Sequence, residues 1–383
     1  METQNKNETE MSEVRGVRDD AEEAILGELR EKINRVDEQL LVLLSQRGKY
    51  SLEVGGIKAK SNMPIFRPAH EKVLLDRLLS HNSGPLPDVH LLAIYKEILS
   101  SSRALQRQEQ VLFLGPEGTF SHRACLEFFG EAQNCRPVMH LADIFTAVES
   151  SESAFGVVPL ENSLNGSVGQ SLDLFVKHQV FVQAEWFSRI RLSLISRESE
   201  MENIQVIYSH AQPFGQCSNW LRDHMPHARH VALESTSLSV RKAAEESGSA
   251  AIGHSDMAYR MGLAVLASSI EDNSDNWTRF FVIGSTPTSG EHADKSSIVF
   301  ALPNTPGSLA NILTTFSAGG INMSKLESRP MQGALWQYMF FADLDCDILA
   351  SSYAAVLQQV KNSCIYFRVL GAYPCGRHIR AGE

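Results

Sequence analysis

The stretch ILGELREKINRVDEQLLVLLSQRGKYSLEVGGIKAK (25–60) decides the fold of the N-terminal region. Its apolar residues recur at alternating steps of three and four, the pattern of a coiled-coil heptad. A helix of about 35 residues is roughly 50 Å long, whereas a compact unit of about 90 residues has a radius of gyration near 12 Å. Because such a helix outgrows its own domain, we expect two copies of the chain to pair along it, as a homodimer or higher homo-oligomer.

The segment before this helix is acidic and lacks apolar periodicity. Residues 1–24 carry eight acidic side chains and three basic ones, so about half of the chain's net charge of -10 lies there. We predict a disordered acidic tail over residues 1–21. An acidic chain disfavours nucleic acid or an anionic membrane as partner. The polar N-terminus and the absence of a long apolar run predict a cytoplasmic protein.

The segments after the helix change in character along the chain, and 383 residues suffice for two or three domains. Two further helices are predicted at 70–80 and 89–108, which gives an all-α domain over 22–110. From Val111, short apolar runs alternate with turns and helical stretches, the pattern of an α/β domain, here 111–286. The remainder, 295–376, reads strand, helix, strand, strand, helix, strand, an order typical of a ferredoxin-like α+β fold.

The long helix carries cations on its apolar seam. Arg47 occupies a seam position, and Lys58 follows three turns later on nearly the same face. Arg30 lies about 260° around the helix from Arg47, so it could join them only from the partner chain of an antiparallel dimer. Either these cations bind an anion, or they form a solvated face. The periodicity alone does not decide between the two.

Polar residues follow several predicted strands of the α/β domain. They lie in five segments: GPEGTFSH (115–122), GVVPLENSLNGSV (156–168), SHAQPFGQCSNWL (209–221), STSLSV (235–240) and NWTRFFVIG (276–284). Each alone could be a turn with a helix cap. Together they predict a ligand crevice at the carboxyl ends of the strands. The six cysteines show no CxxC pair or ligand spacing, so we expect no metal, cofactor or disulfide.

Residues 29–58, together with PIFRPAHEKVLL (64–75) and IYKEILSSSRALQ (94–106), resemble the all-helical chorismate mutase domain. The resemblance implies that Arg30, Arg47 and Lys58 clamp the substrate, with Arg30 donated across the dimer. It implies that Glu71 and Gln106 bind the substrate hydroxyl and the ether oxygen. The rearrangement of chorismate to prephenate is pericyclic, so such a site has only to hold a dianion in a compact shape and stabilise developing charge.

The mutase resemblance has one departure. In the family, an arginine usually precedes the acidic residue that matches Glu71, but this chain has His70 at that position. The unperturbed pKa of histidine, about 6.5, leaves it mostly neutral near pH 7. Mutase efficiency should then fall as the pH rises through that pKa, and a profile that is flat from about pH 6 to 8.5 would contradict this. The alternative is that another cation, such as Arg67, substitutes.

Residues 111–284 resemble prephenate dehydratase, which holds its substrate between two α/β lobes. In that family the threonine matching Thr278 is catalytic, and we predict that it is a general acid. The arginine matching Arg279 helps to hold a carboxylate. Asn162, Ser209 and Gln216 match positions implicated in substrate binding or turnover.

PGSLANIL (306–313) and INMSKLESRP (321–330) resemble the ACT domain attached to these dehydratases, which binds L-phenylalanine. A glycine turn that opens a helix can supply N–H groups to an amino-acid carboxylate. The usual Gly-Ala-Leu is Gly-Ser-Leu here. The resemblance implies an allosteric phenylalanine site formed by Gly307, Ser308, Leu309, Glu327, Ser328, Arg329 and Pro330.

Together the segments predict a bifunctional enzyme that converts chorismate to prephenate and prephenate to phenylpyruvate, under feedback inhibition by L-phenylalanine. Two alternatives stay open at this point. The chain could be a dehydratase with an impaired mutase domain, or a non-catalytic two-lobed ligand sensor, since this architecture also serves binding proteins.

Overall fold

The computed structural model describes residues 2–61, 65–151, 154–288, 292–330 and 338–376, with side chains described from residue 22 onward. The chain forms two compact units, which are described separately. The first comprises residues 1–65 with 105–107, and the second comprises residues 66–104 with 108–383.

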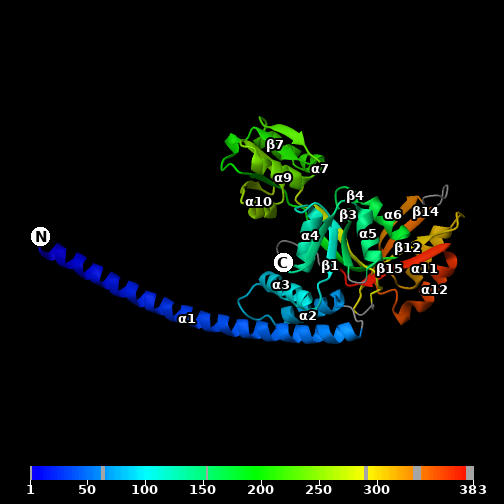
Figure 1. Ribbon diagram of the computed structural model, residues 1–383, viewed down its shortest axis with the longest axis horizontal. Helices are drawn as coiled ribbons and strands as arrows, with labels where there is room; N and C mark the ends of the chain where they lie inside the picture. The colour runs from blue at the N-terminus through cyan, green and yellow to red at the C-terminus, as the bar shows by residue number, and fades with distance from the viewer. Residues whose placement is uncertain (1, 62–64, 152–153, 289–291, 331–337, 377–383) are drawn as a thin grey trace. The chain divides into compact units, whose positions relative to one another are not determined.

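The first unit is built on a single helix, α1 (Glu2–Lys60), which Figure 1 draws as one continuous ribbon. The helix predicted from the heptad is confirmed, and α1 begins at Glu2, so it includes residues 2–21 of the segment predicted as an acidic tail. Extending an existing helix avoids the cost of a new nucleus, and most residues of this segment are tolerated in a helix. Local propensity therefore overrides the lack of an apolar face there.

Residues 105–107 pack against the C-terminal half of α1. A Cβ added at Gly55 would lie 2.9 Å from Cα of Gln106, and one at Gly48 would contact Cδ1 of Leu105 at 3.6 Å. Gly55 thus permits a close approach of the two backbones that no larger residue would allow. This contact fixes Gln106 beside the turn of α1 that precedes Lys58.

The second unit begins with α2 (Pro68–Ser80) and α3 (Asp88–Gln106, whose last two residues belong to the first unit). A lobe with a mixed sheet follows. Its strand order is β2 (Asn134–Val138), β1 (Gln110–Leu114), β3 (Ala154–Asn162), β11 (Trp277–Gly284) and β5 (Phe181–Arg189), with β4 (Gly166–Ser167) paired to β3. The helices of this lobe are α4 (Phe120–Phe129), α5 (Leu141–Glu149) and α6 (Gly169–Lys177).

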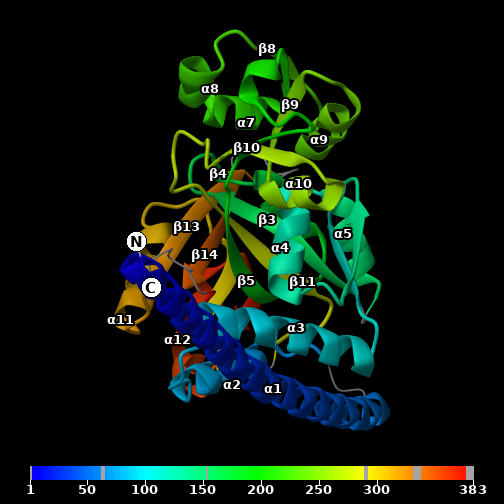
Figure 2. The same cartoon turned by 90° about the vertical axis from the view of Figure 1, so that its left-hand side faces the viewer.

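A second lobe is inserted between β5 and β11, and Figure 2 shows it above the first. Its sheet has the order β10 (Ala264–Ser268), β6 (Ser193–Ser196), β9 (Ser249–Gly253), β7 (Val206–Ser209) and β8 (Arg229–Ala232). Its helices are α7 (Ala211–Gln216), α8 (Ser218–His224), α9 (Thr236–Glu245) and α10 (Ser255–Met261), with a 3-10 turn, η1 (Met201–Asn203).

The chain crosses between the lobes twice, and the two crossings are tied together. Ile190 N donates to Asn276 O at 2.8 Å, and Ile270 N donates to Leu192 O at 2.9 Å. The two-lobed α/β fold predicted from the sequence is therefore confirmed.

The last part of the unit is a four-stranded antiparallel sheet with the order β13 (Met323–Pro330), β14 (Tyr338–Leu344), β12 (Lys295–Ala301) and β15 (Tyr366–Tyr373). Two helices and a 3-10 turn accompany it: α11 (Ser308–Ala318), η2 (Ser351–Tyr353) and α12 (Ala354–Ser363). The predicted order of elements is confirmed. The second helix starts later than the predicted Ile348, because the chain first makes the 3-10 turn. Residues 336 and 337 of the third predicted strand lie outside the described residues.

One face of this sheet packs on the first lobe. Val299, Phe341 and Leu370 share a buried cluster with Val182 and Phe281 of the lobe. Burial of this apolar surface holds the two sheets face to face.

Four strands of the α/β domain, β2, β5, β8 and β10, lie at the edges of their sheets. An edge strand needs no continuous apolar run, so these segments mix polar and apolar residues and their pattern is weak.

Candidate active sites

Thr278 and Asn162 are cross-strand partners in the first lobe, at the end of the sheet nearest the crossings. Thr278 lies on β11 and Asn162 is the last residue of β3. The register of the two strands shifts between Arg279 and Phe280, which leaves Leu160 as an extra residue in β3. Since side chains alternate along a strand, this bulge brings Asn162 to the face of Thr278 and turns Glu161 to the opposite face.

The Asn162 amide is oriented by the backbone. Its Oδ1 accepts hydrogen bonds from Leu164 N at 3.1 Å and Asn165 N at 3.0 Å. Both partners can only donate, so the other amide atom must be Nδ2. Asn162 Nδ2 lies 3.0 Å from Thr278 Oγ1 and 2.8 Å from Asn276 Oδ1. Thr278 Oγ1 therefore accepts from the amide, and its own O–H stays available to donate.

Ser209 and Gln216 lie in the second lobe, at the end of β7 and the end of α7. Ser209 is fully buried, and its Oγ has no hydrogen-bond partner among the described residues. The structure therefore does not join Ser209 to the Asn162–Thr278 pair. A buried hydroxyl without a partner is costly, and a ligand that supplied one would recover that cost.

Arg279 points away from Thr278, because the two are neighbours on one strand. Its guanidinium is buried against Glu185 of β5, at 2.6 Å, and Asp343 of β14, at 2.5 Å. Burial alone would lower the pKa of Arg279, but the oxygens of Tyr373, Asp343 and Glu185 outweigh it and raise that pKa. The predicted contact of Arg279 with a substrate carboxylate does not fit this placement, since two protein carboxylates already occupy the guanidinium.

Arg30, Arg47 and Lys58 all lie on α1, as predicted. Arg30 is exposed, Arg47 and Lys58 are half-buried, and Lys58 Nζ donates to Ile65 O at 3.1 Å. Gln106 lies against Gly55 of the same unit, and its Oε1 is buried without a hydrogen-bond partner in the described part of the chain. The structure thus brings Gln106 to α1 near Lys58, with a polar atom left for a ligand.

Glu71 belongs to the second unit and has a protein partner there. Both of its carboxylate oxygens lie 2.6 Å from Nη1 of Arg103, which also donates from Nη2 to Phe129 O at 2.6 Å. Arg103 is buried, so this pair is stronger than an ordinary surface ion pair. A substrate hydroxyl that binds Glu71 would share the carboxylate with Arg103. His70 is exposed.

The predicted phenylalanine residues lie on α11 and β13. Gly307 has φ +84°, a left-handed conformation that favours glycine, directly before α11. Ser308 Oγ lies 2.7 Å from Thr305 Oγ1, and Leu309 packs against the core of this domain. Along β13, Glu327 and Arg329 face the first lobe and Ser328 and Pro330 are exposed: Ser167 donates to Glu327, and Arg329 pairs with Asp173 at 3.1 Å.

The four-stranded sheet that starts at Lys295 and its helices form the third domain. Sequence reasoning missed a set of charged residues between this domain and the first lobe: Glu161, Glu185, Lys295, Lys325 and Asp343. Glu161, Glu185 and Asp343 are charged residues within largely apolar strands, but Lys295 and Lys325 have no such signal in the sequence. In the described part of the chain, no group of three or more His, Cys, Asp or Glu side chains is placed to hold a metal ion. No described helix is both long and apolar enough to span a bilayer.

Comparison with known proteins identifies two families in this chain. Residues 29–107 match the family model "Chorismate mutase type II", and residues 111–288 match "Prephenate dehydratase". The bifunctional chorismate mutase/prephenate dehydratase of Aquifex aeolicus is 36% identical over 91% of this chain and 98% of its own length.

Two solved structures resemble the second unit. A prephenate dehydratase from Staphylococcus aureus is 30% identical with a TM-score of 0.62, over 69% of this chain and 99% of its own. A prephenate dehydratase from Arthrobacter aurescens, solved in complex with L-Phe, is 32% identical with a TM-score of 0.62, over 69% of this chain and 90% of its own.

Both domains and both reactions of phenylalanine biosynthesis predicted from the sequence are confirmed by these relatives, and the reading as a non-catalytic sensor has no support among them. The chain belongs to the family of bifunctional chorismate mutase/prephenate dehydratases.

Proposed function

We propose that Thr278 is the general acid of the dehydratase reaction and that Asn162 orients it. The reaction expels hydroxide and carbon dioxide from prephenate and forms an aromatic ring. Aromatisation supplies the driving force, so the enzyme has mainly to help the hydroxyl leave. The observation that carries the proposal is the 3.0 Å contact from Asn162 Nδ2 to Thr278 Oγ1.

This contact suits an acid. A hydroxyl has one proton to give and two lone pairs to accept with. With a lone pair of Oγ1 engaged by Asn162, the Thr278 O–H is free to point to the leaving oxygen, and the amide stabilises the charge that develops on Oγ1. Ser209 and Gln216 would bind prephenate from the other lobe. We assign Arg279 no contact with substrate.

For the mutase reaction, we assign Arg47 and Lys58 to the substrate carboxylates and Gln106 to the ether oxygen. Arg30 would come from the partner chain, and Glu71 would bind the hydroxyl. An ether oxygen can only accept, so Gln106 would donate to it from Nε2. The buried Oε1, unpartnered in the described part of the chain, supports a ligand that also offers a donor such as a hydroxyl, because such an atom is otherwise costly. The mutase domain covers 22–110 and the dehydratase domain 111–286.

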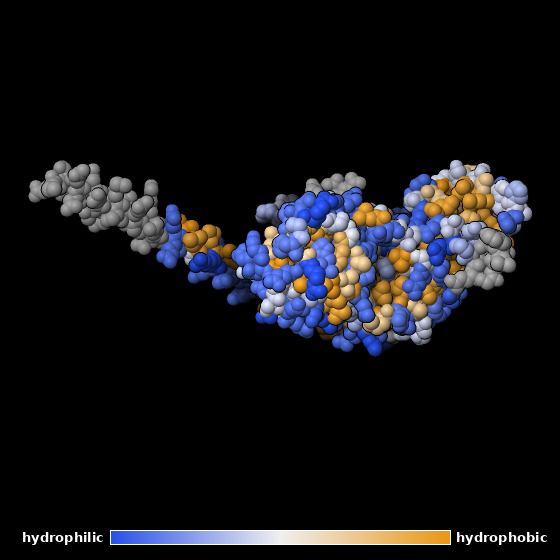
Figure 3. All heavy atoms as spheres, turned by 90° about the horizontal axis from the view of Figure 1, so that it is seen from above, coloured by the Kyte–Doolittle hydropathy of each residue, from blue (hydrophilic) through white to orange (hydrophobic). Residues whose placement is uncertain are grey.

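A dimer through α1 follows from its exposed apolar seam. Leu29 is 47%, Ile33 58%, Val36 53% and Leu40 50% exposed. Figure 3 shows apolar side chains at the surface of the stretch of α1 that is visible in that view. Apolar side chains at heptad spacing favour pairing with a second such helix, which would also bring a second Arg30 to each site.

We assign residues 295–376 to an ACT domain that binds L-phenylalanine and inhibits the enzyme. The strand order of its sheet supports the assignment, as does the relative solved with L-Phe. The effector would contact Gly307, Ser308, Leu309, Glu327, Ser328, Arg329 and Pro330. It would act by favouring one arrangement of domains or subunits, which is coupling rather than blockage of the active site.

The test is a time course by NMR. The full chain is incubated with chorismate, with and without L-phenylalanine, beside a sample without enzyme, while chorismate, prephenate and phenylpyruvate are followed. We expect phenylpyruvate to form with enzyme and to be suppressed by phenylalanine. A Thr278→Val chain should accumulate prephenate, and phenylpyruvate formation at the wild-type rate in that variant would contradict the role of Thr278.

A further inference from the structure

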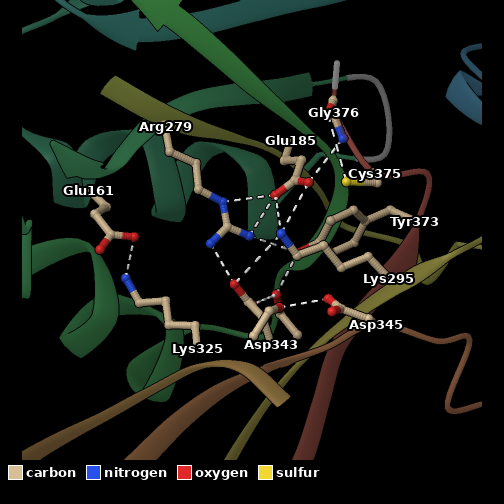
Figure 4. Close-up of polar contacts among 12 residues, drawn as sticks. Glu161, Glu185, Arg279, Lys295, Lys325, Asp343, Asp345, Tyr373, Cys375 and Gly376 are labelled. Atoms are coloured by element: carbon tan, nitrogen blue, oxygen red, sulfur yellow. Dashed lines mark hydrogen bonds and ion pairs between the residues drawn. The ribbon is translucent and has the colours of Figure 1, made fainter. Parts of the chain in front are cut away.

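Charged side chains form two facing rows between the first lobe and the third domain (Figure 4). In the lobe, Glu161, Arg279 and Glu185 lie on the neighbouring strands β3, β11 and β5. In the third domain, the facing residues lie on the neighbouring strands β13, β14 and β12, and they are Lys325, Asp343 and Lys295. The signs alternate along each row and are opposite between the rows. We refer to these six residues as the charge clamp.

Each residue of the charge clamp forms an ion pair with the residue that faces it. Lys325 Nζ lies 2.5 Å from Glu161 Oε2, Arg279 Nη1 lies 2.5 Å from Asp343 Oδ2, and Lys295 Nζ lies 3.0 Å from Glu185 Oε2. Beside the clamp, the hydroxyls of Tyr373 and Ser297 share a hydrogen bond of 2.5 Å. Burial of Tyr373, together with the nearby Asp343 carboxylate, raises the pKa of Tyr373. The clamp is therefore electrically balanced and fully paired.

The central pairs of the charge clamp are buried. The side chains of Arg279, Asp343 and Glu185 are 7%, 6% and 0% exposed. A buried ion pair adds little net stability, but removal of one partner leaves an uncompensated charge. The two rows therefore lock in one register, because sliding one sheet by a strand would set like charges face to face.

Two residues of the charge clamp are chain neighbours of the proposed catalytic pair. Glu161 precedes Asn162 on β3, and Arg279 follows Thr278 on β11. Across the two strands, Glu161 is the register partner of Arg279, and Asn162 is the register partner of Thr278. The Asn162 amide and the Thr278 hydroxyl thus lie on one face of β3 and β11. On the other face, Glu161 and Arg279 form ion pairs with Lys325 and Asp343 of the third domain. A shift of β13 or β14 would be transmitted to Asn162 and Thr278 across a single peptide unit.

We propose that the charge clamp positions Asn162 and Thr278, and that an effector on β13 changes dehydratase turnover through it. The inference rests on the proposed roles of Thr278 and of the ACT domain. None of the six residues touches substrate in this account, so they are positioning residues. Lys325 lies two residues before Glu327 on β13, which connects the proposed phenylalanine site to the clamp.

The test uses two variants of the full chain. Asp343→Asn removes a clamp charge from the third domain without a change of shape. Glu161→Gln removes a clamp charge from the first lobe, at a carboxylate that is 37% exposed, where misfolding is least expected. We expect each to lower dehydratase kcat roughly 2- to 30-fold, with KM for prephenate little changed. The phenylalanine concentration for half-inhibition should also shift, while mutase activity of the same chain stays constant.

Arg368→Gln is the matched control. Arg368 crosses the same interface from β15, but it donates to the carbonyls of Phe175, His178 and Val180, away from β3 and β11. It should lower the melting temperature and leave kcat and half-inhibition as in the wild type. The proposal is overturned if both clamp variants keep wild-type kcat and half-inhibition, or if Arg368→Gln reproduces their loss. If phenylalanine does not inhibit the wild-type chain, the proposed regulation is overturned instead. The dehydratase kcat of the two clamp variants would still test the positioning role.

Discussion

The two candidate active sites are built in opposite ways. The Asn162–Thr278 pair is assembled within one chain, by the register of β3 and β11 and by a bulge at Leu160. The mutase cations are spread along α1, a helix whose apolar seam is exposed in the single chain. A site held by a packed sheet is complete in one copy, whereas a site on an unpaired helix needs a second copy. The first site should therefore survive conditions that separate chains, and the second should not.

The largest expected effect is on the dehydratase site. Thr278→Val keeps the shape and removes the hydroxyl, so it should lower dehydratase kcat by about 10²- to 10⁴-fold. Mutase activity should not change, because the proposed mutase cations lie on α1, in a different unit of the chain from β11. Steady-state assays with prephenate and with chorismate measure the two. A kcat within a few-fold of wild type would rule out Thr278 as the acid.

Arg47→Gln tests the other site. Loss of a cation that stabilises the transition state should lower mutase kcat by about 10²- to 10³-fold, with dehydratase activity retained. If the three cations are only a solvated face, mutase activity will be unaffected.

Leu40→Asp places a charge in the proposed seam. We expect mainly monomers by sedimentation and little change in dehydratase activity. Mutase activity should fall at least tenfold, since a loss of about 1.4 kcal/mol of transition-state stabilisation suffices for that. Ser45→Asp, on the opposite side of the helix and also exposed, is the matched control. Equal mutase losses in the two variants would argue against the seam.

The smallest expected effect is a pH dependence of stability in the second lobe. Burial alone would raise the pKa of Asp272, but Asn219 N, Trp220 N and Ser218 Oγ donate to its carboxylate and lower that pKa. A lowered folded-state pKa contributes stability above the unfolded value of about 3.9, and this stability is lost as the pH falls through the folded value. Thermal unfolding from pH 7 to 3 should show a shallower loss in Asp272→Asn than in the wild type. Identical slopes would contradict the role of Asp272.

Much of this could be predicted from sequence because the signals are local. The seam of α1, the buried runs of β1, β3 and β9, and the polar residues after them are all visible as patterns. The direction in which Arg279 points has no local signal in the sequence. It depends on the third domain, which supplies Asp343, and on the bulge at Leu160. The pairing of Glu71 with Arg103 likewise joins residues on different helices, which no spacing rule links.

Subunit mixing tests the central contrast most directly. Chains with Arg30→Gln and chains with Arg47→Gln are each expected to lack mutase activity and to keep dehydratase activity. In a mixed dimer, one site takes Arg47 from one chain and Arg30 from the other. After exchange of equal amounts, mutase activity should return to about a quarter of the wild-type value, as expected for one intact site in half of the dimers. A mixture that stays inactive despite demonstrated exchange would contradict a mutase site shared between two chains.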